Sequence, residues 1–472
     1  MDSPDNHVAS LPGAPRSSGR AAFVVVAVAA CLLAGLAPAL SLPVQARDRV
    51  PVLLGPVEPL AEWPQLPDDD TESPVLVRDG DGVTAFLQEG CCGVVYARER
   101  MRGGTWSPEQ EVPCVWSGMS TDYCKVYGAA VGVEGELVAL VHLFTGRRTA
   151  LAISVRAAGQ TSWSDPQLIS DGYVVAGNTR PTIRGTGAGA LLVTFGDFRR
   201  GRPDALIAAH LRPGQTWDAA TYHRLPNVQW PQVSGLSRRG RAVVIYSNDP
   251  GLTAPVLVAR FIPGHGWAKP TRIGTGWTEN YAVAMGLGGR AVATWLETNT
   301  DSTGSTLTTQ SQRVRLMTRR GHWSRAWVLA RGERGTSGNA RVWIHGEAGV
   351  AWSPWIGDAV RVAAKPVGEP WQKETIAGGR NGGPLRVVDI NPAGNLVLTW
   401  VSWREGVGDR LVLALRPRGS NWSAPRIVYT DQDTASGSAL VRRSGSAIVA
   451  YGDDNLQQGV ARRAYLDRDD SG

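Results

Sequence analysis

Acidic side chains recur just after short apolar runs that close with an aromatic residue. The acids at these places are Glu89, Asp197, Asp249, Glu297 and the pair Asp453–Asp454. A second polar set precedes later apolar runs and consists of Asp171, Tyr173, Asn178, Arg180, Trp277, Glu279 and Tyr281. Carboxylates, an arginine and exposed aromatic rings are the groups that a sugar site uses, and clustered carboxylates also bind Ca²⁺.

From these sets we predict a ligand site made of Asn178, Arg180, Asp197, Asp249, Trp277 and Glu297. Asp197, Glu279 and Tyr281 are the candidates if the site is catalytic, with Arg180 holding an acidic substrate. The alternative is that these loop acids only solvate the rim and cap strand ends. We predict no metal site, because the seven histidines include no pair at metal-ligand spacing and Asp79–Gly82 has the pattern of a hairpin turn.

The elements that carry these residues repeat along the chain. Seven tryptophans follow glycine-containing turns, and 316 residues separate the first, Trp106, from the last, Trp422, which is a mean spacing of about 53. Each unit has a run with alternating polarity before this tryptophan, such as 206–213, and an aromatic-closed run further upstream, such as 191–195. These patterns predict four short antiparallel strands, a to d, per unit and no helix.

Four-stranded units at this period predict an all-β fold, a β-propeller over residues 74–466. The pattern favours eight blades, with seven as the alternative. The last unit lacks its strand d, which we expect 50–59 to supply, so that the N-terminal strand closes the ring. The rival interpretation of this proline-rich part of 47–73 is a flexible linker, and 467–472 is expected to be a disordered tail.

In a propeller the b–c and d–a loops share one face, and the a–b and c–d turns share the other. The predicted ligand site therefore belongs to the b–c/d–a face. Cys91 and Cys92 fall in the b–c loop of blade 1, and Cys114 and Cys124 fall in the next d–a loop. We favour two disulfides between these loops, because a bond between sequence neighbours is strained. The alternative is a local Cys114–Cys124 bond with Cys91 and Cys92 as a vicinal pair.

The turns at 103–106 and 214–217 read Gly-x-Thr-Trp and resemble the second half of the Asp-box of sialidase-like propellers. The resemblance implies that these turns lie on c–d hairpins. The chain departs from the family where its Ser and Asp would stand, since His210 and Arg212 precede Trp217. We find no arginine-triad signature of the sialidases either; the nearest segment is 179–181. The resemblance therefore implies the fold, and we expect the repeat tryptophans to be packing anchors between blades.

The N-terminus predicts export. The apolar run 21–42 is followed by Val44-Gln45-Ala46, which a signal peptidase accepts, so 1–46 is expected to be a cleaved signal peptide. An uncleaved anchor over 21–42 and lipidation at Cys31 are the alternatives. All three place the propeller outside the cytoplasm, where nucleic acid is not an expected partner. The net charge of +7 on 472 residues then fits anionic envelope polymers or acidic glycans, or simply solubility.

Two functions follow from this sequence. The first is an exported, non-catalytic propeller that binds a glycan, a cell-envelope polymer or a protein on the b–c/d–a face. The second is a sialidase-like glycoside hydrolase or lyase that acts on an acidic sugar. Neither requires a cofactor, although Ca²⁺ would suit the carboxylates. A purely structural envelope protein is the third reading, because the fold does not fix the function.

Overall fold

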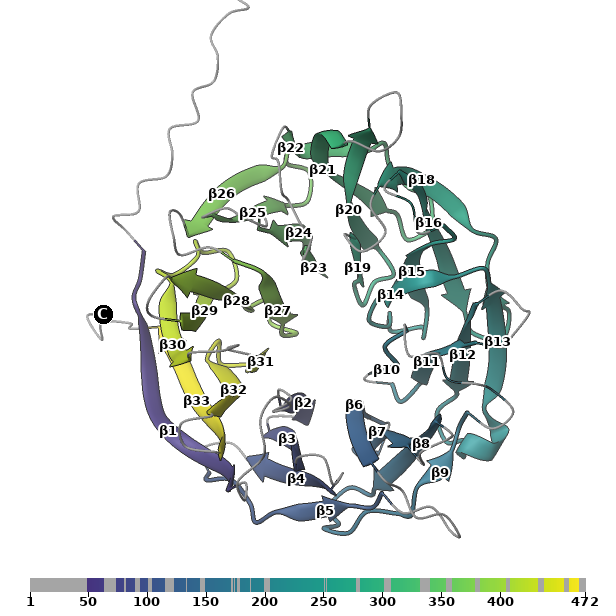
Figure 1. Ribbon diagram of the computed structural model, residues 1–472, viewed down its shortest axis with the longest axis vertical. Coiled ribbons are helices and arrows are strands. Elements are labelled where there is room, and N and C mark those ends of the chain that lie inside the picture. The colour runs from purple at the N-terminus through teal and green to yellow at the C-terminus, as the bar shows by residue number, and fades with distance from the viewer. Residues whose placement is uncertain are drawn as a thin grey trace, which may run out of the picture. The chain divides into compact units, whose positions relative to one another are not determined.

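The described part of the chain is a ring of eight antiparallel sheets (Figure 1). The computed structural model describes residues 49–62, 74–79, 82–89, 94–100, 104–114, 123–132, 134–144, 149–170, 173, 175, 179–186, 188–198, 204–249, 251, 253–276, 281–300, 307–331, 340–353, 359–377, 383–404, 408–431, 437–453 and 458–466. The predicted signal or anchor at 1–46 and the predicted tail at 467–472 lie outside the described residues. No helix in the described ranges is long and apolar enough to cross a bilayer.

The sheets follow the chain in order, each with its first strand innermost and its last strand outermost (Figure 1). Blades 1 and 2 contain β2 (Val75–Asp79), β3 (Gly82–Glu89), β4 (Val94–Arg100), β5 (Gln110–Val112), β6 (Tyr123–Val131), β7 (Leu137–Phe144), β8 (Thr149–Arg156) and β9 (Gln167–Leu168). Blades 3 and 4 contain β10 (Thr182–Gly185), β11 (Leu191–Asp197), β12 (Ala205–Leu211), β13 (Thr221–Pro226), β14 (Gln229–Val233), β15 (Ala242–Ser247), β16 (Ala254–Ile262), β17 (Gly266–Trp267) and β18 (Thr271–Gly276).

The second half of the ring repeats the same plan. Blades 5 and 6 contain β19 (Tyr281–Met285), β20 (Ala291–Thr300), β21 (Leu307–Met317), β22 (Trp327–Arg331), β23 (Arg341–His345), β24 (Glu347–Trp352), β25 (Val360–Lys365) and β26 (Gln372–Ala377). Blades 7 and 8 contain β27 (Leu385–Ile390), β28 (Leu396–Arg404), β29 (Gly408–Arg416), β30 (Arg426–Asp431), β31 (Gly437–Val441), β32 (Ala447–Asp453), β33 (Gln458–Leu466) and β1 (Val52–Glu62). The predicted eight-bladed, all-β propeller is confirmed.

The core lies between neighbouring blades and is built from the middle strands. Every residue of β11 and of β15 is buried, whereas the outermost strand β13 is mostly exposed. A strand in the middle of a blade packs against a neighbouring blade on each of its faces, which explains its continuous apolar run. The aromatic residues that close the second strands are buried, except Phe144, which is 37% exposed; the buried ones are Phe86, Phe195, Tyr246, Trp295, Trp352, Trp400 and Tyr451.

Three of the repeat tryptophans pack against an aromatic ring of the blade before or beside them, as predicted. Trp163 of blade 2 makes an edge contact with Phe86 of blade 1 at 5.7 Å between ring centroids. Trp422 of blade 7 contacts Trp343 of blade 6 at 6.2 Å, and Trp371 at the outer strand of blade 6 contacts Trp327 of blade 5 at 6.4 Å. Edge-to-face contacts of this kind stabilise the blade interfaces beyond the apolar area that they bury.

The N-terminal strand closes the ring, as the repeat count predicts. β1 pairs antiparallel with β33 from Val52 opposite Leu466 to Glu62 opposite Gln458, which makes it the outer strand of blade 8. Leu60 is fully buried against blade 1. Arg100 of blade 1 pairs with Glu58 at 2.7 Å. This described segment is therefore a strand of the ring, and the linker interpretation of residues 50–59 is wrong.

Candidate functional site

The b–c/d–a face gathers three arginines near the centre of the ring. Arg180 directly precedes β10, Arg341 is the first residue of β23, and Arg386 is the second residue of β27. All three strands are innermost strands (Figure 1), and their first residues lie at the end where the d–a loops arrive. We call Arg180, Arg341 and Arg386 the arginine cluster.

One hydrogen bond and the pKa of Arg341 connect the members of the cluster. Arg341 Nε donates a hydrogen bond to the carbonyl of Arg386 at 3.0 Å. Burial, followed by the charges of Arg386 and Arg180, lowers the pKa of Arg341 to about 10. Because Arg180 belongs to blade 3 and Arg341 to blade 6, side chains from separate parts of the ring act on each other across its centre.

The positive charges of the arginine cluster are not neutralised by carboxylates of the described residues. Among the described residues, no carboxylate forms an ion pair with Arg180, Arg341 or Arg386. Arg386 also has a buried Nε without a hydrogen-bond partner. Like charges held together raise the free energy of the empty site, so an anion placed there would be stabilised.

A second feature of the same face is a pocket of about 240 Å³ between blades 3 and 4. It is lined by Asp204, Asn227, Val228, Gln229 and Asn248, from the b–c loops and the d–a connection of these blades. We call it the amide pocket. Asn227 and Asn248 are exposed. Three amides and a carboxylate around a small hollow are suited to hydrogen bonds with hydroxyl groups.

Beside the amide pocket, Trp230 is held in a strained conformation. Its φ of 52° lies in the left-handed region that a bulky residue rarely adopts, and Asn227 has a φ of 57°. The phenol of Tyr281 in blade 5 donates to the carbonyl of Trp230 at 2.5 Å and lies 3.2 Å from that of Gln229. This contact fixes the backbone at the start of β14, and Trp230 is 38% exposed.

The predicted site residues occupy different environments. Asp249 is exposed, and its Oδ1 accepts a hydrogen bond from the Gly251 amide at 3.0 Å. Glu297 on β20 accepts from Arg313 Nε at 2.8 Å and keeps only 23% of its side chain exposed. Tyr281 is 4% exposed and positions the chain at Trp230. Asn178, Trp277 and Glu279 lie outside the described residues.

Asp197 does not lie on an exposed loop as the sequence suggests. It is the last residue of β11, it is fully buried, and its carboxylate forms an ion pair with Arg224. The carboxylate is therefore buried and paired at the end of blade 3 and not exposed in the b–c loop. The sequence pattern placed Asp197 one position too far outside the strand, because β11 continues two residues beyond Phe195.

The favoured disulfide pairing is wrong. Cys114 and Cys124 bond to each other, with their Cα atoms 5.8 Å apart, and so they close the d–a loop between β5 and β6. Both cysteines belong to the buried cluster between blades 1 and 2. A Cα–Cα distance of this size is the usual one for a disulfide. Cys91 and Cys92 lie outside the described residues. In the described ranges no group of three or more acids, histidines or cysteines could hold a metal ion.

Sequence reasoning found Arg180 but missed Arg341, Arg386, Asn227, Trp230 and Asn248. The two arginines carry a weak signal, since each lies at the start of the first strand of its unit, where a side chain can face the ring centre. Trp230 also lies at the start of a first strand, β14, but what sets it apart is its positive φ and its contact with Tyr281, which no local pattern predicts.

No family model matches this chain, and no curated protein sequence is significantly similar to it. Solved structures with similar folds include the polysaccharide lyase Uly1, at 9% identity and a TM-score of 0.41 over 83% of this chain and 89% of that one. An ulvan lyase of a new polysaccharide lyase family, bound to -[GlcA(1-4)Rha3S]-, has 12% identity and a TM-score of 0.39 over 84% and 94%. A post-proline cleaving enzyme from Rickettsia typhi has 10% identity and a TM-score of 0.44 over 81% and 57%.

These similarities are too remote to assign a function to this chain. The strand pairing itself defines it as an eight-bladed β-propeller. The sialidase-like subgroup suggested by the Gly-x-Thr-Trp turns is not established by any of these comparisons.

Proposed function

We propose that this propeller is an exported protein that binds an acidic glycan on its b–c/d–a face without catalysing a reaction. The arginine cluster is the observation that carries the proposal. Three guanidinium groups that have no described carboxylate partner form a site for anionic groups, and arginine binds carboxylates and sulfates through paired N–H donors.

The amide pocket and Trp230 support a glycan as the carrier of that charge. Amide side chains bond to sugar hydroxyls, and an exposed aromatic ring stacks on the apolar face of a sugar. The positive φ of Trp230 strains the backbone and costs free energy. The hydrogen bond from Tyr281 holds the backbone in this conformation. Export is proposed from the apolar segment 21–42 and fits the Cys114–Cys124 bond.

The binding test uses the purified protein with polygalacturonate, hyaluronate and neutral dextran in calorimetric titrations. We expect the two uronate polymers to bind and dextran to bind much more weakly. The double variant Arg341→Gln/Arg386→Gln should lose at least about tenfold in affinity, since each lost charge-assisted contact is worth roughly 1.5–3 kcal/mol. Arg426→Gln is the matched control, because Arg426 is exposed on the outer strand β30. An equal loss of affinity in the double variant and in Arg426→Gln would contradict the proposal.

The non-catalytic part is tested separately, by incubating the protein with the same uronate polymers and with fluorogenic glycosides. New reducing ends, unsaturated uronates or released fluorophore would support the hydrolase or lyase instead. In that case Asp197→Asn would show whether the buried carboxylate takes part. The proposal of export is tested by sequencing the N-terminus of the protein recovered from its native cells, with a start at Arg47 expected for cleavage after Ala46.

A further inference from the structure

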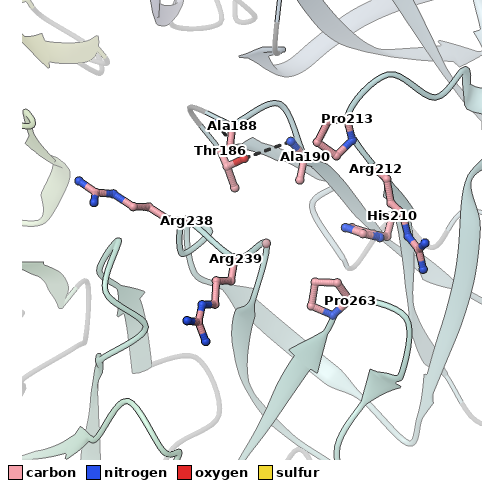
Figure 2. A pocket seen from close by; sticks show the side chains of 10 residues that line it. Thr186, Ala188, Ala190, His210, Arg212, Pro213, Arg238, Arg239 and Pro263 are labelled. Atoms are coloured by element: carbon pink, nitrogen blue, oxygen red, sulfur yellow. Dashed lines mark hydrogen bonds between the residues drawn. The ribbon is translucent and has the colours of Figure 1, made fainter.

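A second pocket, of about 330 Å³, opens on the opposite, a–b/c–d face between blades 3 and 4 (Figure 2). Its walls come from the β10–β11 and β14–β15 turns and from the ends of β12 and β16. We call it the turn pocket; it is lined by Thr186, Ala188, Ala190, His210, Arg212, Pro213, Arg238, Arg239, Gly240 and Pro263. None of these residues belongs to the glycan site proposed above.

His210 is the most informative residue of the turn pocket. Only 2% of it is exposed, yet neither Nδ1 nor Nε2 has a hydrogen-bond partner. Figure 2 shows the imidazole extending from β12 toward the pocket, between Arg212 and Pro263. A buried polar group left without a hydrogen-bond partner destabilises the fold, and most buried polar groups in folded proteins have one. A molecule in the turn pocket could supply the missing partner.

The charges around His210 indicate what that molecule is. Arg212, Arg238 and Arg239 are exposed, and among the described residues none of them pairs with a carboxylate. The one hydroxyl in the wall, of Thr186, already accepts from the amide of Ala190 at 3.1 Å. The remaining walls are alanine and proline side chains and Gly240. The surroundings thus combine positive charge, one unpartnered imidazole and a compact apolar lining.

Gly240 keeps the space beside His210 open. Its φ of 70° requires glycine for the turn, and a Cβ built there would lie 3.2 Å from Pro263 Cγ and 3.6 Å from His210 Nε2. His210 and Arg212 are also the two positions at which the chain departs from the Asp-box pattern. The departure from that motif therefore coincides with the polar wall of the turn pocket.

We propose that the turn pocket binds a small organic oxyanion, a carboxylate or phosphate group carried by a compact body of about monosaccharide size. The oxyanion accepts a hydrogen bond from His210 and is neutralised by Arg212 together with Arg239 or Arg238. In Figure 2 the two latter guanidinium groups extend away from His210, and as exposed side chains they can turn toward a bound anion at little cost. The apolar walls contact the body of the ligand.

Binding should strengthen as the pH falls. Burial, followed by the charges of Arg212 and His223, lowers the pKa of His210, so the ring is neutral in the empty pocket near pH 7. An anion beside it favours the imidazolium form and takes up a proton. Arg238 and Arg239 line the same pocket from the β14–β15 turn, and His223 lies on β13; burial lowers the pKa of His223 too. A readout specific to His210 is therefore required.

The experiment is an NMR titration of the full chain with ¹⁵N-labelled histidine rings, with His210 assigned from the His210→Gln variant. Sodium glucuronate, inorganic phosphate and neutral glucose are the probes, at constant ionic strength. We expect a saturable shift of the His210 resonances with glucuronate or phosphate and none with glucose, while His142 stays unchanged. A response to glucuronate alone identifies a carboxylate site and a response to phosphate alone a phosphate site; either supports the proposal.

Arg212→Gln/Arg239→Gln should weaken the response at least about tenfold, as expected for losing two charge-assisted contacts. Arg319→Gln/Arg320→Gln, at the corresponding turn of blade 5, should leave it unchanged. The proposal is overturned if no probe gives a saturable shift, which would mean that His210 holds only water. It is also overturned if glucose acts like the anions, or if both double variants respond equally.

Discussion

At the scale of single residues, buried side chains stabilise the propeller, whereas exposed ones are available to bind a ligand. His142 on β7 illustrates the first case. Burial and the charge of Lys125 lower its pKa to about 4, from 6.5 for a free histidine. Because the folded pKa is below the unfolded one, the stabilisation is complete above about pH 6.5 and is lost as the pH falls toward 4. The shift corresponds to about 3 kcal/mol, and to about half of that after allowance for the partly exposed ring.

We therefore expect the wild type to lose about 1–2 kcal/mol more free energy of unfolding than His142→Gln between about pH 7 and about pH 4. Urea unfolding of both proteins at the two pH values checks this. His265→Gln, which removes an exposed histidine, is the control and should follow the wild type. Parallel losses in all three proteins would show that His142 does not contribute.

The same scale separates what the sequence could predict from what it could not. Arg180 is predictable because it falls in a d–a loop together with other polar and aromatic residues. Arg341 and Arg386 were missed because their importance comes from proximity across the ring, which no local pattern records. The position of Asp197 was predicted incorrectly because an acid at a strand end can either face solvent or pair with a side chain of the same sheet. Here it pairs with Arg224 on β13, two strands away in the sheet.

At the scale of elements, β1 carries a buried leucine and an exposed leucine whose substitutions can be compared. Leu60 is fully buried at the interface with blade 1, whereas Leu53 on the same strand is 37% exposed. Leu60→Ala should cost about 2–5 kcal/mol, because it leaves a cavity between two blades. Leu53→Ala should cost less than about 1 kcal/mol. Thermal melts of the two variants measure the difference, and deletion of residues 47–60 should be worse than either. Equal melting temperatures for all of them would contradict the closing role of β1.

The Cys114–Cys124 loop is the other element with a testable contribution. The two cysteines are ten positions apart, and closing a loop of this length stabilises the fold by about 2–3 kcal/mol in the chain-entropy description. Cys114→Ala/Cys124→Ala should melt a few degrees below the wild type. Dithiothreitol should bring the wild type down to the same temperature and leave the variant unchanged. A wild type that does not respond to the reductant would show that the bond contributes little.

The architecture itself was the most predictable level. Turns about every ten residues, aromatic-closed strands and a period near 53 are local signals. Because each of them repeats in most blades, an error in one unit does not change the predicted number of blades. The disulfide was predicted incorrectly for the opposite reason. It depends on how close Cys114 and Cys124 lie in space, which the repeating pattern of the blades does not predict.

At the scale of the whole molecule, charge governs the proposed function. The chain carries a net charge of +7, and the arginine cluster lies near the centre of the ring. Attraction between this site and a polyuronate is screened by salt, whose Debye length falls from about 10 Å at 0.1 M to about 3 Å at 1 M. We expect the affinity for polygalacturonate to decrease at least about tenfold over this range, measured by calorimetry, with little change for Arg341→Gln/Arg386→Gln. Salt-independent binding by the wild type would contradict an electrostatic mechanism.

Because β1 pairs with β33, the ring cannot close until β33 has been synthesised. Arg462 Nε donates to the carbonyl of Gly55, which lies 407 positions earlier in the chain. At 5–20 residues per second, a ribosome needs roughly 20–80 seconds to make the partner that β1 requires. Throughout that time β1 is a strand without a neighbour, and blade 1 lacks the cover that Leu60 provides. Blade 8 can therefore be completed only after β33 has been synthesised, and a polypeptide that stops short of β33 would leave β1 as an unpaired strand edge.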